Sequence, residues 1–248
     1  MHHFYYLHVS KSKKIAPVHN LNADHSNLRD PEISSTLSIN KSKAKKLRLF
    51  AFLSWFLAIG IEVAAYFVLQ KTPINFVLLT VLIVLILIFA ILGSYLWKKA
   101  NRLDPASKKN KIKFFIQNQL GVIMSLIAFA PLIILIFMNK DMSKKQKGIF
   151  GSIAVIALLI AGVSGADFNP PSFEKYKEQT EQVKSLNGGN DYVYWTKSGK
   201  SYHLFSSYSY VNSDRTTEII EGTVTQSRAL KNITDLCDHC EKNSQKEH

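Results

Sequence analysis

Four long apolar segments fill the middle of this 248-residue chain and constrain its fold more than any other feature. A helix needs roughly 20 apolar residues to cross about 30 Å of hydrocarbon, and the four segments meet or approach that length. One such run would suit a buried core helix of a soluble protein, whereas four in series with almost no internal charge predict a membrane domain. We therefore expect transmembrane helices at residues 49–69, 76–97, 114–138 and 149–166.

The distribution of basic residues predicts how these helices are oriented. The formal net charge is +13, and because residues 167–248 hold 10 basic and 12 acidic residues, residues 1–166 carry an excess of +15. The basic residues lie mainly before the first run and between the second and third, and basic loops stay in the cytoplasm. We expect a multi-pass protein of a cell membrane, with the N-terminus and the C-terminal module both cytoplasmic. Lysines 140, 144, 145 and 147 oppose this orientation, so an outside module is the alternative.

The partners expected from these features are the lipid bilayer and a protein partner or a second copy of the chain. A positive excess beside apolar runs indicates membrane topology, so we do not expect nucleic-acid binding. Ala157, Ala161 and Gly165 recur every four residues in the fourth run, beside Gly162. Small residues at this spacing allow close helix contact, and we expect packing within the chain rather than homodimerisation.

Glu62 lies in the middle of the first apolar run and is the expected intramembrane polar site. A carboxylate there is costly, so it should face other helices or a water-filled cavity. One interpretation is an ion or proton site of a small ion-coupled transporter. The other is a structural hydrogen bond across the bundle to Gln117, Asn118, Gln119 or a serine. In the third run, Pro131 should kink the helix because it removes a backbone donor.

The ends of the chain differ from the middle. Residues 1–46 are polar and basic without sustained periodicity, and we expect a mostly disordered cytoplasmic tail. Residues 47–166 form the transmembrane domain, and residues 167–190 a linker helix. Ser172 should cap that helix and "NGGN" should stop it, with Phe173, Tyr176, Thr180 and Val183 on one face.

Residues 191–248 form a small C-terminal module in this interpretation. "DYVYWT" and "SYHLF" predict a hairpin around "KSGK", and "TEIIEG" predicts a third strand. "TVTQSRALK" predicts a short helix capped by Thr223 with Gln226 three residues on. The expected fold is thus an all-α bundle of four transmembrane helices plus a small α+β, zinc-ribbon-like module.

The only two cysteines of the chain, Cys237 and Cys240, lie in "DLCDHC" near its end. A Cys-x2-Cys turn presents two sulfurs as tetrahedral zinc requires, and so small a module often needs a metal or a disulfide. His203 on the hairpin is the best third ligand. His239, between the cysteines, is a weaker candidate because residues inside such a turn usually point away from the metal.

"VYWTKSGKSYHL" and "EGTVTQSRALKNITDLCDHC" together resemble a small module appended to bacterial membrane and secreted proteins. Its pattern is Tyr-His, four residues, Cys, and then about thirty residues to Cys-x2-Cys. That module is similar to the zinc-binding segment of DNA-alkylation repair proteins. The whole chain also resembles uncharacterised bacterial multi-pass membrane proteins that carry it. The resemblance implies zinc at His203, Cys237 and Cys240.

This sequence departs from the pattern at one ligand. Tyr208 stands where the module expects its first cysteine, and the neighbouring Ser206 and Ser207 replace a thiolate poorly. Three interpretations stay open: a weak zinc site, a Cys237–Cys240 disulfide or free redox pair, and a metal-free remnant. Restoring the ligand by Tyr208→Cys should raise zinc affinity.

Motifs typical of enzymes are missing from the sequence, which has no Gly-rich phosphate loop, His-Glu-x-x-His or Gly-x-Ser-x-Gly. A thioredoxin-like function needs Cys-x2-Cys at the start of a helix after a strand, whereas here it closes the chain. We therefore expect a non-enzymatic integral membrane protein whose soluble tail binds metal or a partner. The alternatives are an ion-coupled transporter that uses Glu62 and a membrane thiol-redox protein that uses Cys237 and Cys240.

Overall fold

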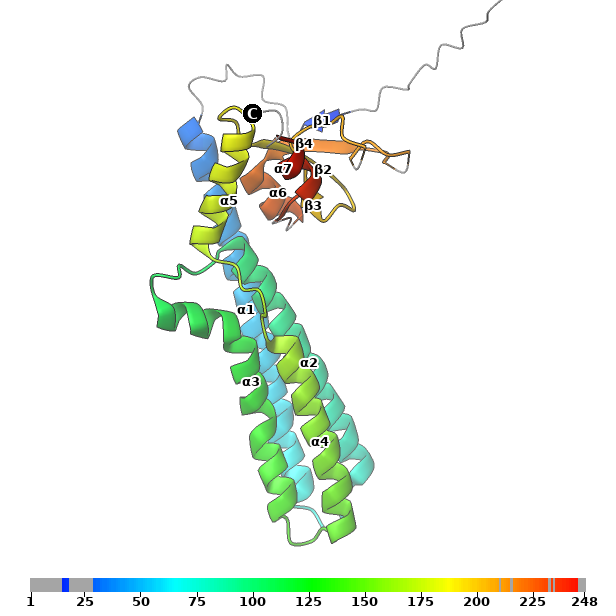
Figure 1. Cartoon of the computed structure of the whole chain (residues 1–248). Coiled ribbons are helices and arrows are strands. Elements are labelled where there is room, and N and C mark those ends of the chain that lie inside the picture. Colours follow the sequence, from blue (N-terminus) through cyan, green and yellow to red (C-terminus); the bar gives the residue numbers. More distant parts are fainter. Residues whose placement is uncertain are drawn as a thin grey trace, which may run out of the picture. The chain divides into compact units, whose positions relative to one another are not determined.

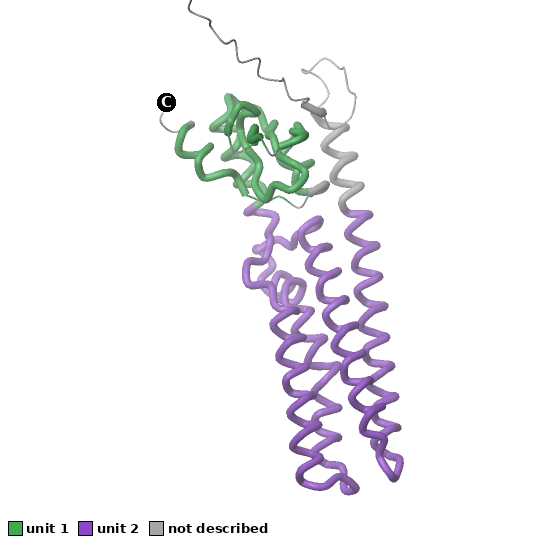
Figure 2. Tube along the Cα trace, turned by 90° about the vertical axis from the view of Figure 1, so that its right-hand side faces the viewer, with its two compact units in different colours: residues 1–36, 176–248 green, residues 37–175 purple. Residues whose placement is uncertain are grey.

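The computed structural model describes residues 15–17, 29–209, 211–214, 216–231, 233 and 235–244. The chain divides into two compact units, one of residues 37–175 and one of residues 1–36 with 176–248 (Figure 2). Residues 37–175, unit 2 in Figure 2, form a helical unit, and unit 1 contains the strands. The elements in chain order are β1 (Ile15–Pro17), α1 (Arg29–Leu69), α2 (Phe76–Leu103), α3 (Lys111–Met138), α4 (Lys144–Gly165), α5 (Phe173–Leu186), β2 (Tyr192–Thr196), β3 (Ser201–Tyr202), β4 (Ile219–Thr223), α6 (Val224–Lys231), β5 (Asp235–Leu236) and α7 (Asp238–Ser244).

Four helices of the helical unit are long and apolar enough to cross a membrane, as the four apolar runs predict. They run side by side with short connections (Figure 1). α2 begins where its apolar run begins, whereas α3 and α4 begin before their runs because their capping residues lie further out. Asn75 caps α2, Asn110 caps α3, and Ser143 forms a capping box with Gln146 at the start of α4.

The expectation of a disordered tail through residue 46 is wrong for the part of it that the structure describes. Residues 15–17 form β1, and α1 begins at Arg29 and continues into the first candidate span, which covers Lys41–Leu69. The sequence "RDPE" carries the signals of a helix start, because proline and acidic residues are favoured in the first turn. Residues 1–14 and 18–28 of the expected tail lie outside the described residues.

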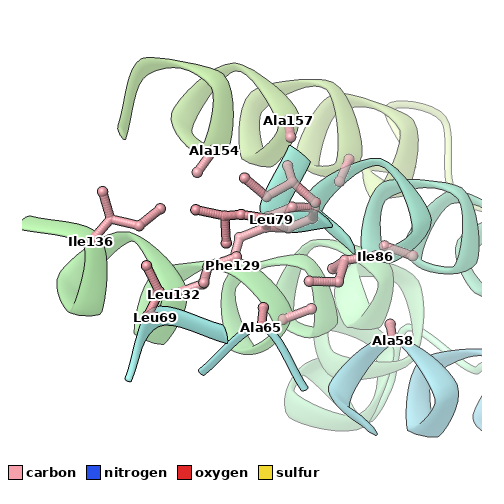
Figure 3. Packing of buried hydrophobic residues seen from close by; sticks show 14 of the residues in the cluster. Ala58, Ala65, Leu69, Leu79, Ile86, Phe129, Leu132, Ile136, Ala154 and Ala157 are labelled. Atoms are coloured by element: carbon pink, nitrogen blue, oxygen red, sulfur yellow. The ribbon is translucent and has the colours of Figure 1, made fainter. Parts of the chain in front are cut away.

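The core of the helical unit is built from small and branched apolar side chains (Figure 3). Each helix contributes to it, and the buried members include Ala58 and Ala65 of α1, Leu79 and Ile86 of α2, Phe129 and Leu132 of α3, and Ala154 and Ala157 of α4. Many larger apolar side chains face outward instead; Phe56 is 69% exposed and Val77 is 78% exposed. An outer surface of this kind suits lipid rather than water.

Two glycines bring the backbones of α3 and α4 into contact. A Cβ atom added at Gly165 would lie 2.6 Å from the carbonyl carbon of Gly121, so no side chain fits at either position. Ala157 and Ala161 on the same face of α4 are also buried, which confirms that this small-residue stripe packs within the chain. A Cβ atom at Gly162 would meet nothing within 4 Å, so this glycine is not part of the contact.

An ion pair and two tryptophans join α1 and α2 at one end of the bundle. Arg48 donates to a carboxylate oxygen of Asp104 at 2.8 Å and lies 5.6 Å from the ring centre of Trp97. Trp97 packs against Trp55 with ring centres 5.6 Å apart. A Cβ atom at Gly93 would lie 2.5 Å from Trp55, so the Trp55 ring packs directly on the α2 backbone.

The unit that contains the strands is an α+β fold, as the sequence predicts. Its larger sheet has the order β1-β4-β2, with β4 parallel to β1 and antiparallel to β2. The smaller sheet pairs β3 with β5 in parallel. The buried core includes Val183 of α5, Val193 and Trp195 of β2, Tyr202 of β3 and Val224 of α6.

The helices that frame this fold begin and end where the sequence predicts. The Ser172 hydroxyl accepts from the Lys175 N–H at 3.0 Å at the start of α5. Gly188 and Gly189, with φ of 58° and 89°, end that helix in a conformation that favours glycine. Thr223 and Gln226 form the expected capping box of α6. On the predicted face of α5, Val183 is buried, whereas Phe173 in the first turn is 60% exposed.

Candidate metal centre

A β-bridge places His203 at the base of the predicted hairpin. The backbone N–H of Tyr194 donates to the carbonyl oxygen of His203 at 2.8 Å, and the N–H of His203 donates back at 2.7 Å. The alternating burial along β2 puts Val193 and Trp195 in the core, as expected for a half-buried strand. The pairing therefore fixes the backbone of His203, and the His203 side chain is buried.

A second pairing brings the cysteines to the same place. β5 lies parallel to β3, with Tyr202 opposite Leu236, and the Cys237 N–H donates to the Tyr202 carbonyl oxygen at 3.0 Å. Cys237 thus follows β5 directly beside His203. The Cys240 N–H then donates to the carbonyl oxygen of Cys237 at 2.9 Å, and this first turn of α7 returns the second sulfur to the site.

The three predicted ligands come together in the structure. One ligand atom from each of His203, Cys237 and Cys240 lies within 4.8 Å of the other two. The Cys240 sulfur is 3.6 Å from Nδ1 of His203. In a tetrahedral zinc site, bonds of about 2.3 Å to sulfur and 2.0–2.1 Å to nitrogen put these two ligand atoms about 3.5 Å apart. The donor set and its spacing therefore fit a zinc ion after a small contraction.

The environment of the site disfavours charged thiols without a cation. The pKa of Cys240 is raised to about 12, chiefly by burial and also by neighbouring Cys237, while a hydrogen bond from the Leu204 backbone opposes the shift. Burial also lowers the pKa of His203. His203 is therefore neutral, as a metal ligand must be, whereas the Cys240 thiol loses its proton when a metal replaces it.

The other residues considered as ligands do not join this group. His239 is exposed on α7, and Ser206 and Ser207 lie in the turn after the hairpin. Tyr208 is half-buried against the core, its ring 5.6 Å from that of Phe205, and its carbonyl oxygen accepts from Asn212 at 2.7 Å. Tyr208 thus fills space as a turn residue, and the group of potential ligands among the described residues has three members.

The structure corrects one argument about the cysteine pair. Cys237 lies between β5 and α7 and Cys240 in the first turn of α7, so the pair follows a strand and begins a helix although it is near the end of the chain. The thiol chemistry, however, differs from that of a reactive pair. A reactive cysteine has a lowered pKa and an exposed sulfur, whereas Cys240 has a raised pKa and is fully buried.

Glu62, the predicted intramembrane site, is also buried, with 8% of its surface exposed. Its carboxylate accepts a hydrogen bond from the Leu132 N–H at 3.2 Å. The partners expected from the sequence are wrong, because the side chains of Gln117, Asn118 and Gln119 donate to backbone carbonyls of Asp104, Phe114 and Asp167. The sequence signal for the true partner is Pro131, which lies inside α3 next to Leu132 and cannot donate a backbone hydrogen bond.

None of the protein-family models, curated proteins or solved structures compared with the chain matches it. The class of protein therefore rests on the four apolar helices and the three-ligand cluster.

Proposed function

We propose that this chain is a four-span integral membrane protein whose C-terminal unit binds a zinc ion through His203, Cys237 and Cys240. The observation that carries the proposal is the convergence of these three ligand atoms within 4.8 Å. His203 comes from a hairpin and the two cysteines from a strand–helix junction, so the cluster is not a consequence of sequence proximity. We infer a non-enzymatic role in which the metal holds a small soluble unit in a defined shape.

The donor set supports zinc over harder cations. Two thiolates and an imidazole suit zinc, whereas calcium and magnesium prefer oxygen ligands. The small core supports a structural role, since units of this size often need a metal to hold them. With three protein ligands, the fourth position is left to water or to a group from a partner.

Metal analysis of the purified protein tests this proposal. We expect about one zinc per chain after purification in detergent without chelators, and a large loss in His203→Gln and in Cys240→Ser. His239→Gln is the matched control. His239 lies between the two cysteines in the sequence but is not part of the cluster. Equal zinc content in all four proteins would contradict the ligand assignment.

Tyr208→Cys tests the resemblance to the four-ligand module. If position 208 approaches the site as the resemblance implies, a third thiolate should raise zinc affinity by at least about tenfold. The measurement is competition with a zinc chelator, with Ser207→Cys as the control in the same turn. Equal affinity of the Tyr208→Cys variant and the unmodified protein would reject Tyr208 as the lost ligand position.

The proposed orientation puts both chain ends in the cytoplasm of a bacterial cell. Basic residues support it, since the end of the bundle that bears Lys98, Lys99 and Arg102 is more positive than the end that bears Lys71. Both cysteines of the chain lie in the C-terminal unit, so a membrane-impermeant thiol reagent reports its side directly. We expect labelling only after lysis and zinc removal. Labelling in intact cells would place this unit outside.

A thiol-redox function is the second candidate, and the placement of Cys237 and Cys240 at a strand–helix junction favours it. Both functions use the same sulfurs and predict different states of them. Zinc binding predicts two reduced thiols protected from alkylation until a chelator is added. The redox function predicts a disulfide that a reductant opens, with no effect of a chelator.

A further inference from the structure

The first two turns of α3 depart from the direction of the rest of that helix. Figure 1 shows them running across the bundle before α3 turns along it, and Figure 2 shows the same segment nearly end-on. Asn110 starts the helix, with its side chain accepting from the Lys113 N–H at 3.0 Å. These turns are therefore capped helix that lies outside the parallel packing of α1 to α4.

This segment is amphipathic. Ile112, Phe115 and Ile116 are 75%, 62% and 46% exposed and recur at the i, i+3, i+4 spacing of one helix face. Lys111 and Lys113 are exposed on either side of this apolar stripe, and Lys108 and Lys109 are exposed just before the helix. The opposite face carries Phe114, which is half-buried, and Asn118, which is buried with 2% of its surface exposed. The apolar stripe is thus turned away from the protein and bordered by positive charge.

Hydrogen bonds hold the end of this segment. The indole N–H of Trp97 donates to the backbone carbonyl oxygen of Gln117 at 2.6 Å, and the Asn101 side-chain amide donates to the same oxygen at 2.7 Å. The Gln117 side chain donates to the carbonyl oxygen of Asp104 at 3.1 Å. Side chains that engage a helix carbonyl are a recognised cause of helix bends. The direction of the segment is therefore built into the fold.

We propose that residues 111–117 form an interfacial helix that lies on an anionic lipid leaflet, its apolar stripe at the boundary of headgroups and acyl chains. The segment is continuous with a membrane-spanning helix, and its lysines complement anionic headgroups while their apolar stems extend along the surface. The hydrocarbon span of α3 then begins near Leu120 rather than at residue 114. The remaining 19 residues to Met138 are close to the roughly 20 that a span requires.

Tryptophan quenching in vesicles of phosphatidylcholine and phosphatidylglycerol tests the proposal on the full chain. Phe115→Trp adds one fluorophore to the background of the three native tryptophans. We expect bromines near the headgroups to quench it about twice as strongly as bromines deep in the acyl chains, because interfacial helices lie about 5–10 Å into the boundary. Lys113→Trp, on the flank of the stripe, should be quenched less. Vesicles of phosphatidylcholine alone should give weaker quenching at position 115.

Three results would overturn the proposal. Stronger quenching of Phe115→Trp by deep bromines would make the segment part of the span, and no added quenching would place it off the lipid. Equal quenching with and without phosphatidylglycerol would reject the anionic leaflet as the occupant. The proposal rests on the proposed membrane insertion, which Ile127→Trp tests separately, since this 46% exposed position near the middle of residues 120–138 should be quenched by deep bromines.

Discussion

A carboxylate oxygen of Glu62 accepts a hydrogen bond of 3.2 Å from the backbone N–H of Leu132, the residue after Pro131. Proline cannot donate to its own helix, and its ring displaces the preceding turn, so donors and acceptors near it need other partners. Glu62 supplies one from a different helix. Glu62, the polar residue within the apolar run of α1, thus lies next to Pro131, the residue in α3 that has no backbone donor.

Substitution of Glu62 separates a structural from a transport role. Glu62→Gln keeps an oxygen acceptor for the Leu132 N–H, whereas Glu62→Leu removes it. We expect Glu62→Gln to unfold in detergent like the unmodified protein and Glu62→Leu to lose about 1 kcal/mol of stability. Ion flux in vesicles that Glu62→Gln abolishes without loss of stability would favour the transporter instead.

The contact of α3 and α4 predicts opposite effects for two neighbouring glycines. Gly165→Ala should destabilise the bundle by about 1–3 kcal/mol, because its Cβ meets the Gly121 backbone, which cannot rotate away. Gly162→Ala should be neutral or stabilising by up to about 1 kcal/mol, because it meets open space and favours helix. Thermal unfolding of the two variants in the same detergent checks this. Equal effects would show that the backbones do not touch.

Arg228 joins α6 to α5, and its substitution should release that helix. The buried guanidinium donates to the Tyr176 carbonyl oxygen at 2.9 Å and to the Thr180 hydroxyl at 3.3 Å, and it lies 4.4 Å from the Tyr176 ring centre. Arg228→Lys keeps the charge but loses the planar guanidinium that donates to two groups at once. We therefore expect the free energy of unfolding to fall by about 1–3 kcal/mol.

Hydrogen exchange of residues 176–186 is the measurement for Arg228→Lys. Lys184→Ala is the control, because Lys184 forms a surface ion pair with Glu181 that contributes at most about 1 kcal/mol. Faster exchange in α5 with Arg228→Lys, and little change with Lys184→Ala, is the expected result. Unchanged exchange in both variants would show that Arg228 does not hold α5.

The metal-free C-terminal unit should lose stability in mild acid. Burial lowers the pKa of His203 from its ordinary 6.5, so the unfolded chain binds more protons than the folded chain below that pH. Stability contributed by this linkage is therefore present above pH 6.5 and falls as the pH drops through that value. We expect hydrogen exchange of β2 and β4 in a chelator, corrected for intrinsic rates, to accelerate toward pH 5.

His203→Gln should flatten this pH dependence, since it removes the titrating group. His239→Gln should retain it, because His239 is exposed. Retention of the full acid sensitivity in His203→Gln would assign it to another group.

Local patterns predict most of the fold, because caps, turns and apolar periodicity act within a few residues. The bundle helices, the stop at Gly188 and Gly189 and the capping box of Thr223 follow from such patterns. Pairings between distant segments do not. Nothing in "IAP" shows that Ile15 lies opposite Ile219, and the partner of Glu62 depends on how a bent α3 packs.

The candidate site was predictable in its ligands but not in its framework. Cys-x2-Cys and a hairpin histidine are visible in the sequence, whereas β3 and β5 are two-residue strands too short to leave a periodic signal. Their pairing puts Cys237 beside His203 and begins α7 at the cysteine pair. The sequence argument therefore named the three residues that the structure brings together and misjudged what surrounds the sulfurs.

The separation of His203 and Cys237 has a consequence for the stability of the unit that holds them. The two proposed ligands are 34 positions apart, and the loop between them contains β4 and α6. A metal bound to both acts as a reversible cross-link, which in the chain-entropy account of loops this long is worth about 4 kcal/mol. A peptide bond cut inside the loop leaves the two fragments tethered through the ion, and a chelator then removes that tether.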